Sequence, residues 1–513
     1  MLAKTFGSAV YGVNASMITV EVSVDQGKNF YLVGLPDNAV KESEQRVEAA
    51  LKHYDYFFPR RKVVVNLAPA DIRKEGSAYD LPIALCILHA SEQANFKELE
   101  RYVIMGELSL DGKLRPIKGV LPIAIEARKQ GYKGFILPKE NANEAAIVNN
   151  LDIIPVETLK EAIGFLNGSL IIEPLKVDTR DIFASSQNEY DADFSHVQGQ
   201  ENIKRALEIA AAGGHNVIMI GPPGAGKTML AKRLPTILPP LSLQEALETT
   251  KIHSVAGKLG NKSSLIATRP YRSPHHTISD AALVGGGGMP QPGEISLAHN
   301  GVLFLDELPE FKKTALEVMR QPLEERKVAI ARARWAVEFP ANFMLIASMN
   351  PCPCGYYNHP EKECVCAPGM VQRYLNKISG PLLDRIDLHV EVTPVNFDQM
   401  TANRKAESSE AIRTRVIKAR DIQTKRFEKI DEVYSNAMMP SQMVKQVCEI
   451  SDAGKILLKR AMEKLQLSAR AYDRILRVSR TIADLAGSDE IKTEHLAEAI
   501  QYRSLDRENW AGE

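Results

Sequence analysis

A glycine-rich run that ends in lysine and threonine is the strongest chemical signal in the sequence. It follows the short apolar stretch 217–220 and precedes a segment with helical periodicity, as the pattern G-x-x-x-x-G-K-[ST] requires. The backbone N–H groups of such a loop and the N-terminus of the following helix can surround a chain of phosphates. The sequence therefore predicts a site for a nucleoside triphosphate, formed by Gly221, Pro222, Pro223, Gly224, Ala225, Gly226, Lys227 and Thr228.

Two acidic residues at the end of a second apolar stretch complete the predicted site. In GVLFLDELPEF, residues 301–311, a buried strand is expected to end at Asp306 and Glu307. Asp306 and the hydroxyl of Thr228 would hold Mg²⁺, and Lys227 would reach the β- and γ-phosphates. Glu307 would polarise the attacking water as a general base. The two segments together predict hydrolysis of ATP with Mg²⁺ as the cofactor.

Both motifs resemble those of AAA+ ATPases, and this resemblance gives roles to three more residues. Asn350 ends the strand-like FMLIASMN and corresponds to sensor 1, which positions water near the γ-phosphate. Arg385 lies between a helix-like segment and a strand, where AAA+ rings place an arginine finger aimed at the ATP of the neighbouring subunit. Arg470 opens a predicted lid helix at the sensor 2 position, with Arg474 one turn later as the alternative. If Arg385 acts on a neighbour, a monomer should hydrolyse ATP poorly.

Longer stretches narrow the resemblance to one family. The chain resembles the YifB/ComM family of magnesium-chelatase-like AAA+ proteins over nearly its whole length, in PYRSPHHTISDAALVGGGGMPQPGEISLAHNGVLFLDELPEF, FPANFMLIASMNPCPCGYY and RYLNKISGPLLDRIDLHVEV. This resemblance implies an insertion around 270–295, a hairpin around 324–342 and a helical insertion before sensor 2, so Arg470 could serve its own ATP or a neighbour's. It also implies a homohexameric helicase that drives branch migration of single-stranded or branched DNA in homologous recombination and natural transformation.

Local basic segments offer candidate DNA contacts, although Lys+Arg and Asp+Glu both number 64 in the whole chain. Lys327, Arg332 and Arg334 lie in ERKVAIARARWAVEF, whose alternation predicts a β-hairpin with Trp335 near one arm. By analogy with the family, this hairpin faces a central pore, where its cations could track phosphates. The segment 413–429 carries seven Lys/Arg and two acids. It either contacts DNA or is an ordinary solvated helix face.

Four of the six cysteines crowd into one turn-rich segment. Cys352, Cys354, Cys364 and Cys366 form two C-x-C pairs, with His359 between them. Four thiolates in a reducing compartment suit a tetrahedral Zn²⁺, but C-x-C is less common in zinc sites than C-x-x-C. The alternative is a group of free cysteines that includes a redox-sensitive pair.

Residues 70–138 resemble the proteolytic domain of Lon, whose active site is a Ser-Lys dyad. When the segment KEGSAYD is aligned on Lys74 and Gly76, the serine position holds Ala78, and Ser77 lies one residue early. The segment that begins at Gly106 places Leu121 at the lysine position, with Lys118 one turn away. Both dyad members are missing by this alignment, so proteolysis is disfavoured.

The elements expected around these residues divide the chain into three folded parts. Residues 1–172 alternate strand-like runs such as MITVEVSV with helix-like runs such as VLPIAIEARKQG, and are expected to form a Lon-protease-like α+β domain. Residues 173–195 are polar and acidic and are predicted to be a linker. Residues 196–395 should form a P-loop AAA+ core of αβα layers, and 396–513 an all-helical lid that contains the pre-sensor-2 insertion. The predicted fold class is α/β.

Composition is typical of a soluble protein of several domains. The 513 residues are 44% apolar and 25% charged. No 18-residue apolar run occurs, and the N-terminus lacks the apolar core of a signal peptide. We therefore expect a cytoplasmic protein without membrane contact.

Three other functions compete with the DNA motor. A chelatase-type motor would drive metal insertion or remodel a protein partner, but the N-terminal domain is foreign to that kind of subunit. A Lon-like ATP-dependent protease is disfavoured by Ala78 and Leu121. A non-catalytic scaffold would require broken nucleotide motifs, and these are intact.

Overall fold

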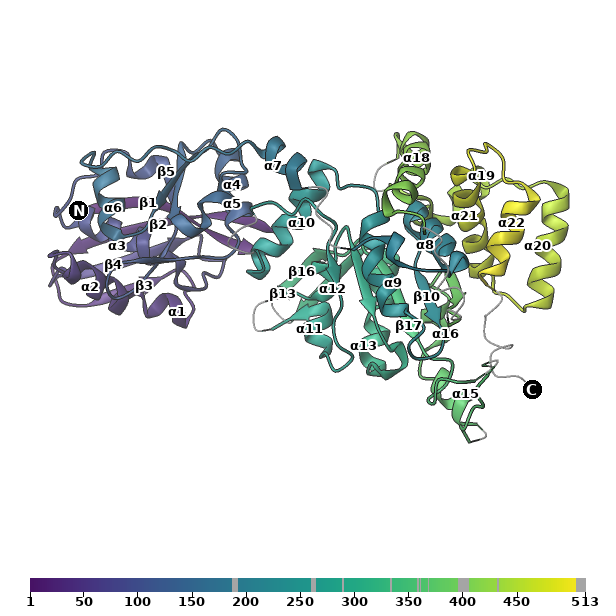
Figure 1. Ribbon diagram of the computed structural model, residues 1–513. Helices are drawn as coiled ribbons and strands as arrows, with labels where there is room; N and C mark the ends of the chain where they lie inside the picture. Colours follow the sequence, from purple (N-terminus) through teal and green to yellow (C-terminus); the bar gives the residue numbers. More distant parts are fainter. Residues whose placement is uncertain are drawn as a thin grey trace. The chain divides into compact units, whose positions relative to one another are not determined.

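A five-stranded parallel sheet carries the phosphate-binding loop in the computed structural model (Figure 1). The strands lie in the order β11 (Tyr271–Arg272), β14 (Val302–Leu305), β17 (Met344–Met349), β10 (Val217–Ile220) and β18 (Leu388–Glu391), and all neighbours are parallel. Every residue of the three central strands is buried. This is the pattern of a parallel sheet covered on both faces. Ligands of such sheets bind at the carboxyl ends of the strands.

The structure describes residues 1–186, 192–259, 264–287, 290–332, 335–357, 359, 361–367, 369–394, 406–430 and 433–503. None of the described helices is both long and apolar enough to cross a membrane.

Helices join the strands of this sheet. α8 (Glu201–Gly213) precedes β10 and packs against β18, and α9 (Lys227–Arg233) follows β10. Short helices connect the remaining strands: α11 (Asp280–Val284), α12 (Glu294–Leu297), α13 (Lys313–Val318), α14 (Arg320–Glu325), α15 (Met370–Leu375) and α16 (Gly380–Leu383). The predicted alternation of strands and helices in the ATPase core is thus confirmed.

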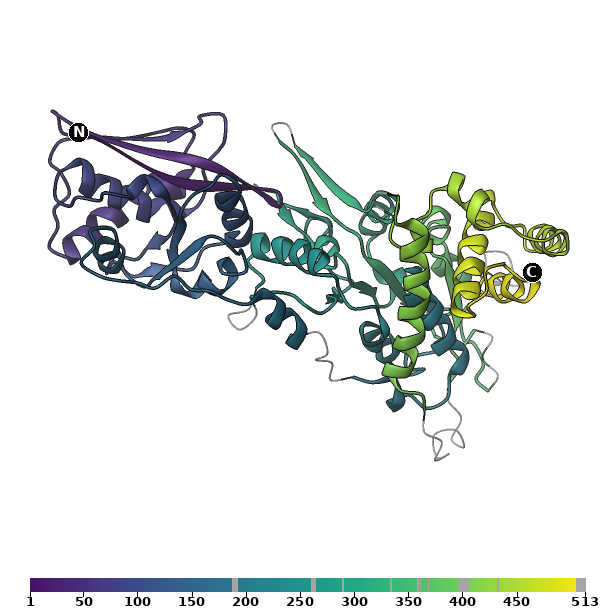
Figure 2. The ribbon, with the colours of Figure 1, turned by 90° about the horizontal axis from the view of Figure 1, so that it is seen from above.

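Two antiparallel hairpins extend from this core. β12 (Gly285–Gly286) pairs with β13 (Gln291–Pro292), and β15 (Lys327–Arg332) pairs over its whole length with β16 (Trp335–Pro340). Figure 2 shows β15 and β16 side by side as an arm. One face of the arm is buried through Val328, Ile330, Val337 and Phe339. The two hairpins touch, because a Cβ built on Gly285 would lie 2.9 Å from Ile330 Cδ1.

The C-terminal part is helical, as predicted. It contains α18 (Ser409–Phe427), α19 (Ser441–Val447), α20 (Asp452–Lys464), α21 (Ala469–Leu485) and α22 (Thr493–Gln501). In 406–430 and 433–503 no strand forms, although Ile450 and Ile491 make an isolated bridge. α18 and α21 both pack against α8, so the helical C-terminal part shares a hydrophobic core with the five-stranded sheet.

The N-terminal part contains a seven-stranded mixed sheet. Its strands lie in the order β3 (Phe30–Val33), β4 (Lys62–Ala68), β2 (Asn14–Asp25), β1 (Leu2–Tyr11), β5 (Tyr102–Ile104), β8 (Gly134–Pro138) and β9 (Asp152–Val156). A small separate hairpin joins β6 (Glu107–Leu108) to β7 (Leu114–Arg115). The helices are α1 (Asn38–Lys41), α2 (Ser43–His53), α3 (Asp80–Ala90), α4 (Val120–Lys129), α5 (Ala142–Ala145) and α6 (Leu159–Leu166). The strand expected at MITVEVSV is β2, and the helix expected at VLPIAIEARKQG is α4.

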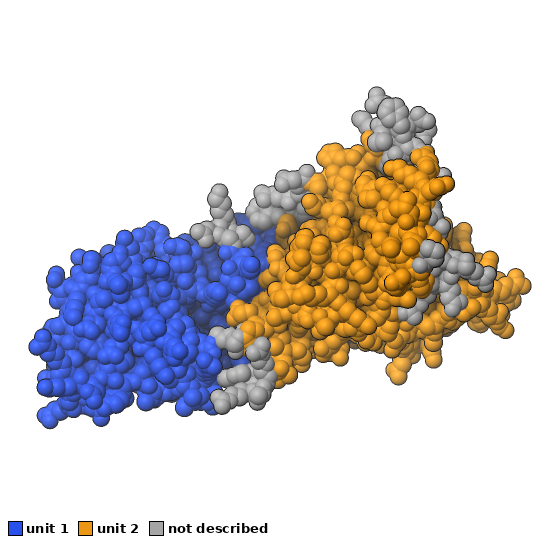
Figure 3. Space-filling view, turned by 90° about the horizontal axis from the view of Figure 1, so that it is seen from below, with its two compact units in different colours: residues 1–186, 243–267 blue, residues 187–242, 268–513 orange. Residues whose placement is uncertain are grey.

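The chain divides into two compact units, coloured separately in Figure 3: residues 1–186 with 243–267 (unit 1), and residues 187–242 with 268–513 (unit 2). The predicted core (196–395) and lid (396–513) fall together in unit 2, and the units differ from the predicted boundaries in two further segments. The expected linker contains a helix, α7 (Thr179–Ser186), whose first side chain donates to Ile147 O, while 187–191 lie outside the described residues. α10 (Leu243–Ala256), expected in the ATPase core, belongs to unit 1.

Helix α10 joins unit 1 because it packs on α4. Gly119 N–H donates to Ser254 O at 3.1 Å, and Ser254 Oγ donates to the Glu144 carboxylate at 2.5 Å. Glu144 also accepts from Leu121 N–H at 2.8 Å. Burial raises the pKa of Glu144, although these hydrogen bonds partly offset the effect. A local sequence pattern cannot indicate such a long-range contact, which explains the difference.

Candidate nucleotide-binding site

The phosphate-binding loop connects the end of β10 to the start of α9. Gly224 and Gly226 have φ values of 80° and 87°, in the left-handed region that glycine adopts without strain. Gly226 caps α9, so Lys227 is the first residue of that helix. The loop thus combines backbone N–H groups with the positive end of a helix dipole, the combination that binds phosphate.

The Lys227 side chain links this loop to the neighbouring strand. Its Nζ donates to Gly221 O at 2.7 Å, to Pro222 O at 3.0 Å and to Asn350 Oδ1 at 3.0 Å. Burial lowers the pKa of the ammonium, and Asp306 and Glu307 oppose that shift. Asn350 follows directly after β17, so sequence-distant residues meet where adjacent parallel strands end.

Asp306 lies between two hydroxyl groups. Thr228 Oγ1 donates to Asp306 Oδ2 at 2.7 Å, and Ser348 Oγ donates to Asp306 Oδ1. Ser348 was not predicted from the sequence. Its position on β17, two residues before Asn350, is the only signal that could have identified it, because parallel pairing places β17 beside β14.

Glu307 adopts a left-handed backbone conformation, with φ 54° and ψ 51°. Such a conformation costs a non-glycine residue about 1 kcal/mol or more. Its carboxylate lies 3.6 Å from His276 Nδ1, and its N–H lies 3.4 Å from Ser348 Oγ. His276 lies in one of the segments that carry the family resemblance, but its contact with Glu307 is not apparent from the sequence. The left-handed turn thus directs the Glu307 side chain toward His276.

The Arg385 side chain packs against its own chain. This side chain is 7% exposed, with Nη2 2.5 Å from Glu324 Oε1 and Nη1 2.6 Å from Pro381 O. A residue that reaches the ATP of a neighbour must leave this arrangement. The predicted arginine-finger role of Arg385 therefore requires that the ion pair with Glu324 opens.

The two lid arginines differ in environment. Arg470 is exposed in the first turn of α21. Arg474, the alternative sensor 2 residue, donates to Asp387 Oδ1 and, at 3.2 Å, to Arg385 O. Burial raises the pKa of Asp387, but Arg474 and His215 outweigh it and hold the pKa well below its ordinary value. Arg474 is thus occupied in attaching the lid, whereas Arg470 is accessible.

The two predicted basic segments, the β15–β16 hairpin and residues 413–429, lie in different environments. On the hairpin, Lys327 is exposed on the face opposite the buried one; Arg334 lies outside the described residues, as do the side chains of Arg332 and Trp335. In the segment 413–429, most of which forms α18, four of the seven cations bind within the chain. Arg413 donates to Leu238 O, Arg415 pairs with Glu208 and Glu407, Arg420 donates to Ala211 O and Ala212 O, and Arg426 pairs with Asp484. Most of the α18 charge therefore stabilises the fold.

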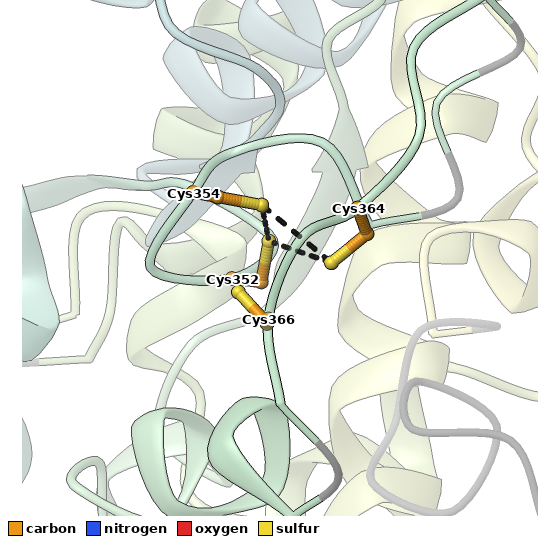
Figure 4. A group of neighbouring side chains, drawn as sticks. All are labelled: Cys352, Cys354, Cys364 and Cys366. Atoms are coloured by element: carbon orange, nitrogen blue, oxygen red, sulfur yellow. Dashed lines mark hydrogen bonds between the residues drawn. The ribbon is translucent and has the colours of Figure 1, made fainter.

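The four clustered cysteines converge (Figure 4). Their sulfur atoms all lie within 4.8 Å of one another. The other two cysteines, Cys86 and Cys448, are buried elsewhere in the chain.

In unit 1, the positions aligned with the Lon dyad are not brought together by any described contact. Leu121 is fully buried. Ser77 Oγ donates to the Glu107 carboxylate, and Ala78 O accepts from Gly106 N–H. Lys118 lies beside Gly257, where a Cβ would be 2.9 Å from its Cε.

The nucleotide-site residues fit a magnesium-bound triphosphate. The Lys227 ammonium binds three oxygen acceptors that a phosphate oxygen could replace. Thr228 and Asp306 already lie within hydrogen-bonding distance of each other, and a hydroxyl and a carboxylate are the oxygen ligands that Mg²⁺ prefers. Glu307 stands next in the chain, beside these two residues. The fold and this site define a P-loop protein of the AAA+ class.

Comparison with known proteins identifies the family. Residues 193–400 match the family model described as magnesium chelatase, subunit ChlI; residues 20–141 match subunit ChlI of Mg-chelatase, and 406–503 match its C-terminal part. The chain is 45% identical over 512 residues to competence protein ComM of Haemophilus influenzae, covering 99% of this chain and 98% of that protein. It is 44% identical over 502 residues to YifB of Escherichia coli, covering 97% and 96%. The chain belongs to the YifB/ComM family of magnesium-chelatase-like AAA+ proteins.

A weaker similarity supports the Lon-like fold. Over 189 residues the chain is 31% identical to Lon protease 2 of Bacillus subtilis, covering 31% of this chain and 33% of that protein. The predicted fold class, α/β with a Lon-like N-terminal part, an AAA+ core and a helical C-terminal part, is confirmed.

Proposed function

We propose that this protein hydrolyses ATP with Mg²⁺ in a cytoplasmic homohexameric ring, and that the ring translocates on single-stranded or branched DNA to drive branch migration. The observation that carries the ATPase part is the arrangement of Lys227, Asn350, Thr228 and Asp306 at the carboxyl ends of adjacent strands.

Each residue has a defined task in the hydrolysis. Lys227 exchanges its carbonyl acceptors for oxygens of the β- and γ-phosphates, and Asn350 holds the attacking water near the γ-phosphate. Thr228 and Asp306 would hold Mg²⁺, which neutralises charge on the phosphates when bound. Glu307 accepts a proton from the water as it attacks phosphorus. The leaving group is ADP, and charge that develops on it must be met by a further cation.

That cation is Arg385 of the adjacent subunit, once its ion pair with Glu324 opens. Arg470, exposed at the start of the lid, is the second candidate. A mixing experiment tests action across the interface, because Arg385→Ala and Glu307→Gln subunits should each be nearly inactive alone. If Arg385 acts in trans, an equal mixture of the two should regain activity at about one quarter of its sites, from random assembly around a ring. A mixture as inactive as its parts contradicts this role.

The DNA part of the proposal has two supports. A relative of nearly equal length is named a competence protein. In addition, the β15–β16 arm presents an exposed Lys327 opposite its buried face. Cations on a projecting hairpin are suited to phosphate contacts that do not depend on base sequence.

DNA-stimulated ATP turnover tests this part most directly. We expect single-stranded or branched DNA to raise the hydrolysis rate, and Lys327→Ala to weaken this stimulation and to lower the salt dependence of DNA binding by about one unit of slope. Lys418→Ala, which removes an exposed charge from α18, is the matched control and should have little effect. If DNA leaves turnover unchanged while a protein or porphyrin partner raises it, the DNA motor is refuted.

Stimulation of ATP turnover by a protein or porphyrin partner, without an effect of DNA, would instead support a second candidate. This candidate is a motor that acts on a protein partner or in metal insertion. The descriptions of the matching family models, which name a magnesium chelatase subunit, favour this candidate over the others.

A further inference from the structure

Four sulfur atoms from two separate turns meet directly after the strand that carries Asn350. Cys352 and Cys354 follow β17, and Cys364 and Cys366 precede α15. In Figure 4 all four side chains point toward a common centre. The Sγ–Sγ distances are 3.3 Å for Cys352–Cys354, 3.7 Å for Cys352–Cys364 and 3.5 Å for Cys354–Cys364.

These distances match one metal ion rather than disulfides. A disulfide requires two sulfurs about 2.05 Å apart, and none of the four cysteines forms one. In a tetrahedral site with metal–sulfur bonds of about 2.3 Å, neighbouring sulfurs are about 3.8 Å apart. An iron–sulfur cluster holds several iron and sulfide atoms between its cysteines, so its ligands would stand farther apart. The spacing therefore fits a mononuclear tetrathiolate site.

The surroundings of the sulfurs support the same conclusion. Cys352 is fully buried, and its Sγ accepts a hydrogen bond from Tyr357 N–H at 3.3 Å. Hydrogen bonds from the protein to ligand atoms orient metal ligands and stabilise their charge. Among cations, Zn²⁺ is the one that four thiolates in a closed tetrahedral site bind most commonly as a structural metal.

The cysteine segment also touches the phosphate-binding loop. Gly355 N–H donates to Cys352 O at 3.0 Å. This hydrogen bond closes a turn over residues 352–355, which include the first two cysteines. Gly355 has φ 85°, and a Cβ at this position would lie 2.5 Å from Pro223 Cδ. Two residues before Cys352, Asn350 accepts the hydrogen bond from Lys227. The segment thus contacts the phosphate-binding loop on both sides of the first cysteine.

We propose that Cys352, Cys354, Cys364 and Cys366 bind one Zn²⁺, and that this zinc holds the segment 350–357 against the phosphate-binding loop, so that Asn350 stays in reach of Lys227. The second half of this proposal rests on the proposed ATPase function. Without zinc, four thiols cannot cross-link the two turns, and the positions of Gly355 and Asn350 depend on weaker contacts alone. Loss of zinc should therefore weaken nucleotide binding and slow hydrolysis.

Metal analysis of the full-length protein tests the site without nucleotide. We expect about one zinc per chain by mass spectrometry, from the four thiolates of a closed site. Protein loaded with Co²⁺ should show the thiolate-to-cobalt charge-transfer band and the d–d bands of a tetrahedral tetrathiolate. Cys352→Ser and Cys364→Ser should lose both signals, whereas Cys448→Ala, at a buried cysteine far along the chain, should keep them. Protein that takes up neither metal stoichiometrically, or that instead contains an iron–sulfur chromophore, overturns the site.

Nucleotide affinity and ATP turnover test the effect on the phosphate-binding loop. Cys364→Ser, which alters a ligand in the turn more distant from Asn350, should raise the dissociation constant for Mg·ATP at least several-fold and lower turnover, while circular dichroism remains that of the folded protein. Gly355→Ala should keep its zinc but also weaken ATP binding, because its Cβ displaces Pro223. If both variants bind and hydrolyse ATP like the natural protein, the positioning role fails, while the proposed ATPase stands. If the natural protein carries zinc but does not bind ATP, the ATPase proposal and the positioning role fail together, and the metal site stands.

Discussion

The buried carboxylate of Asp387 allows a quantitative test of how the lid is attached. Asp387 lies just before β18 and is 4% exposed. It accepts from Arg474 on α21 and, at 3.0 Å, from Asn216 N–H, and it lies 3.4 Å from His215 Nδ1. The residue thus joins the start of β10, the start of β18 and a lid helix.

Asp387→Asn keeps the shape of this side chain but leaves Arg474, whose side chain is 15% exposed, without its counter-charge. Removing one partner of a buried ion pair costs about 3–5 kcal/mol, because the other charge stays desolvated. For a unit of this size, we expect the midpoint of thermal unfolding at pH 7 to fall by roughly 6–15 °C. Scanning calorimetry or circular dichroism measures the change.

The direction of the Asp387 pKa shift determines how the stability difference between the natural protein and the variant changes with pH. The pKa of Asp387 in the folded protein lies below that in the unfolded chain. Its stabilising effect is therefore complete above the unfolded pKa of about 3.9 and is lost as pH falls toward the folded pKa. The difference between natural protein and variant should be constant from pH 8 to about 5 and should narrow only below about pH 4.

Asp421→Asn is the matched control, because Asp421 is exposed on α18. Its unfolding free energy should change by about 0.5 kcal/mol or less. The explanation is refuted if Asp387→Asn is no more destabilising than this control, or if its deficit grows as the solution is acidified.

Three further substitutions test other contacts. Glu307→Gln should bind Mg·ATP but hydrolyse it about 10²–10⁴-fold more slowly, measured by phosphate release and by retention of ATP on the protein. Ser348→Ala removes a hydroxyl that donates to Asp306, and the Mg²⁺ concentration for half-maximal turnover should rise by about tenfold or more in a Mg²⁺ titration. Glu144→Ala leaves Leu121 N–H without its acceptor, and the free energy of unfolding should fall by about 1–3 kcal/mol in denaturant titrations.

Each of these has a result that contradicts it. Undiminished hydrolysis by Glu307→Gln excludes it as the general base. An unchanged Mg²⁺ requirement in Ser348→Ala means that its hydroxyl does not orient Asp306. A Glu144→Ala variant as stable as the natural protein would mean that water replaces the lost acceptor.

The sequence predicted the parts of the nucleotide site that depend on local chain geometry. Lys227 and Thr228 belong to one loop-and-helix motif, and Asp306 ends an apolar strand, so their types and spacing are sufficient. Ser348 and His276 act through contacts between segments far apart in the chain, and each is an ordinary residue in its own segment. Only the pairing of β14 with β17, and the turn at Glu307, bring them to the site.

The binding partners of the predicted arginines could not be predicted from the sequence either. Arg385 and Arg474 were identified from their positions relative to helices and strands, but the sequence does not reveal that Glu324 and Asp387 bind them. On α18, a run of cations was compatible with either DNA contact or a solvated face. The structure provides a third arrangement, in which several of these cations bind carbonyl groups and carboxylates of the same chain.

Because 243–267 belongs to unit 1 while its flanking segments belong to unit 2, the backbone passes between the two units three times. A single cleavage within residues 187–191 would therefore leave the two units joined by two further backbone connections. A truncated protein that begins after residue 186 would keep α10 but lose α4, the helix on which it packs. The N-terminal unit thus cannot be removed or exchanged as one continuous segment, because a protein without it would also need a new connection between the phosphate-binding loop and Asp306.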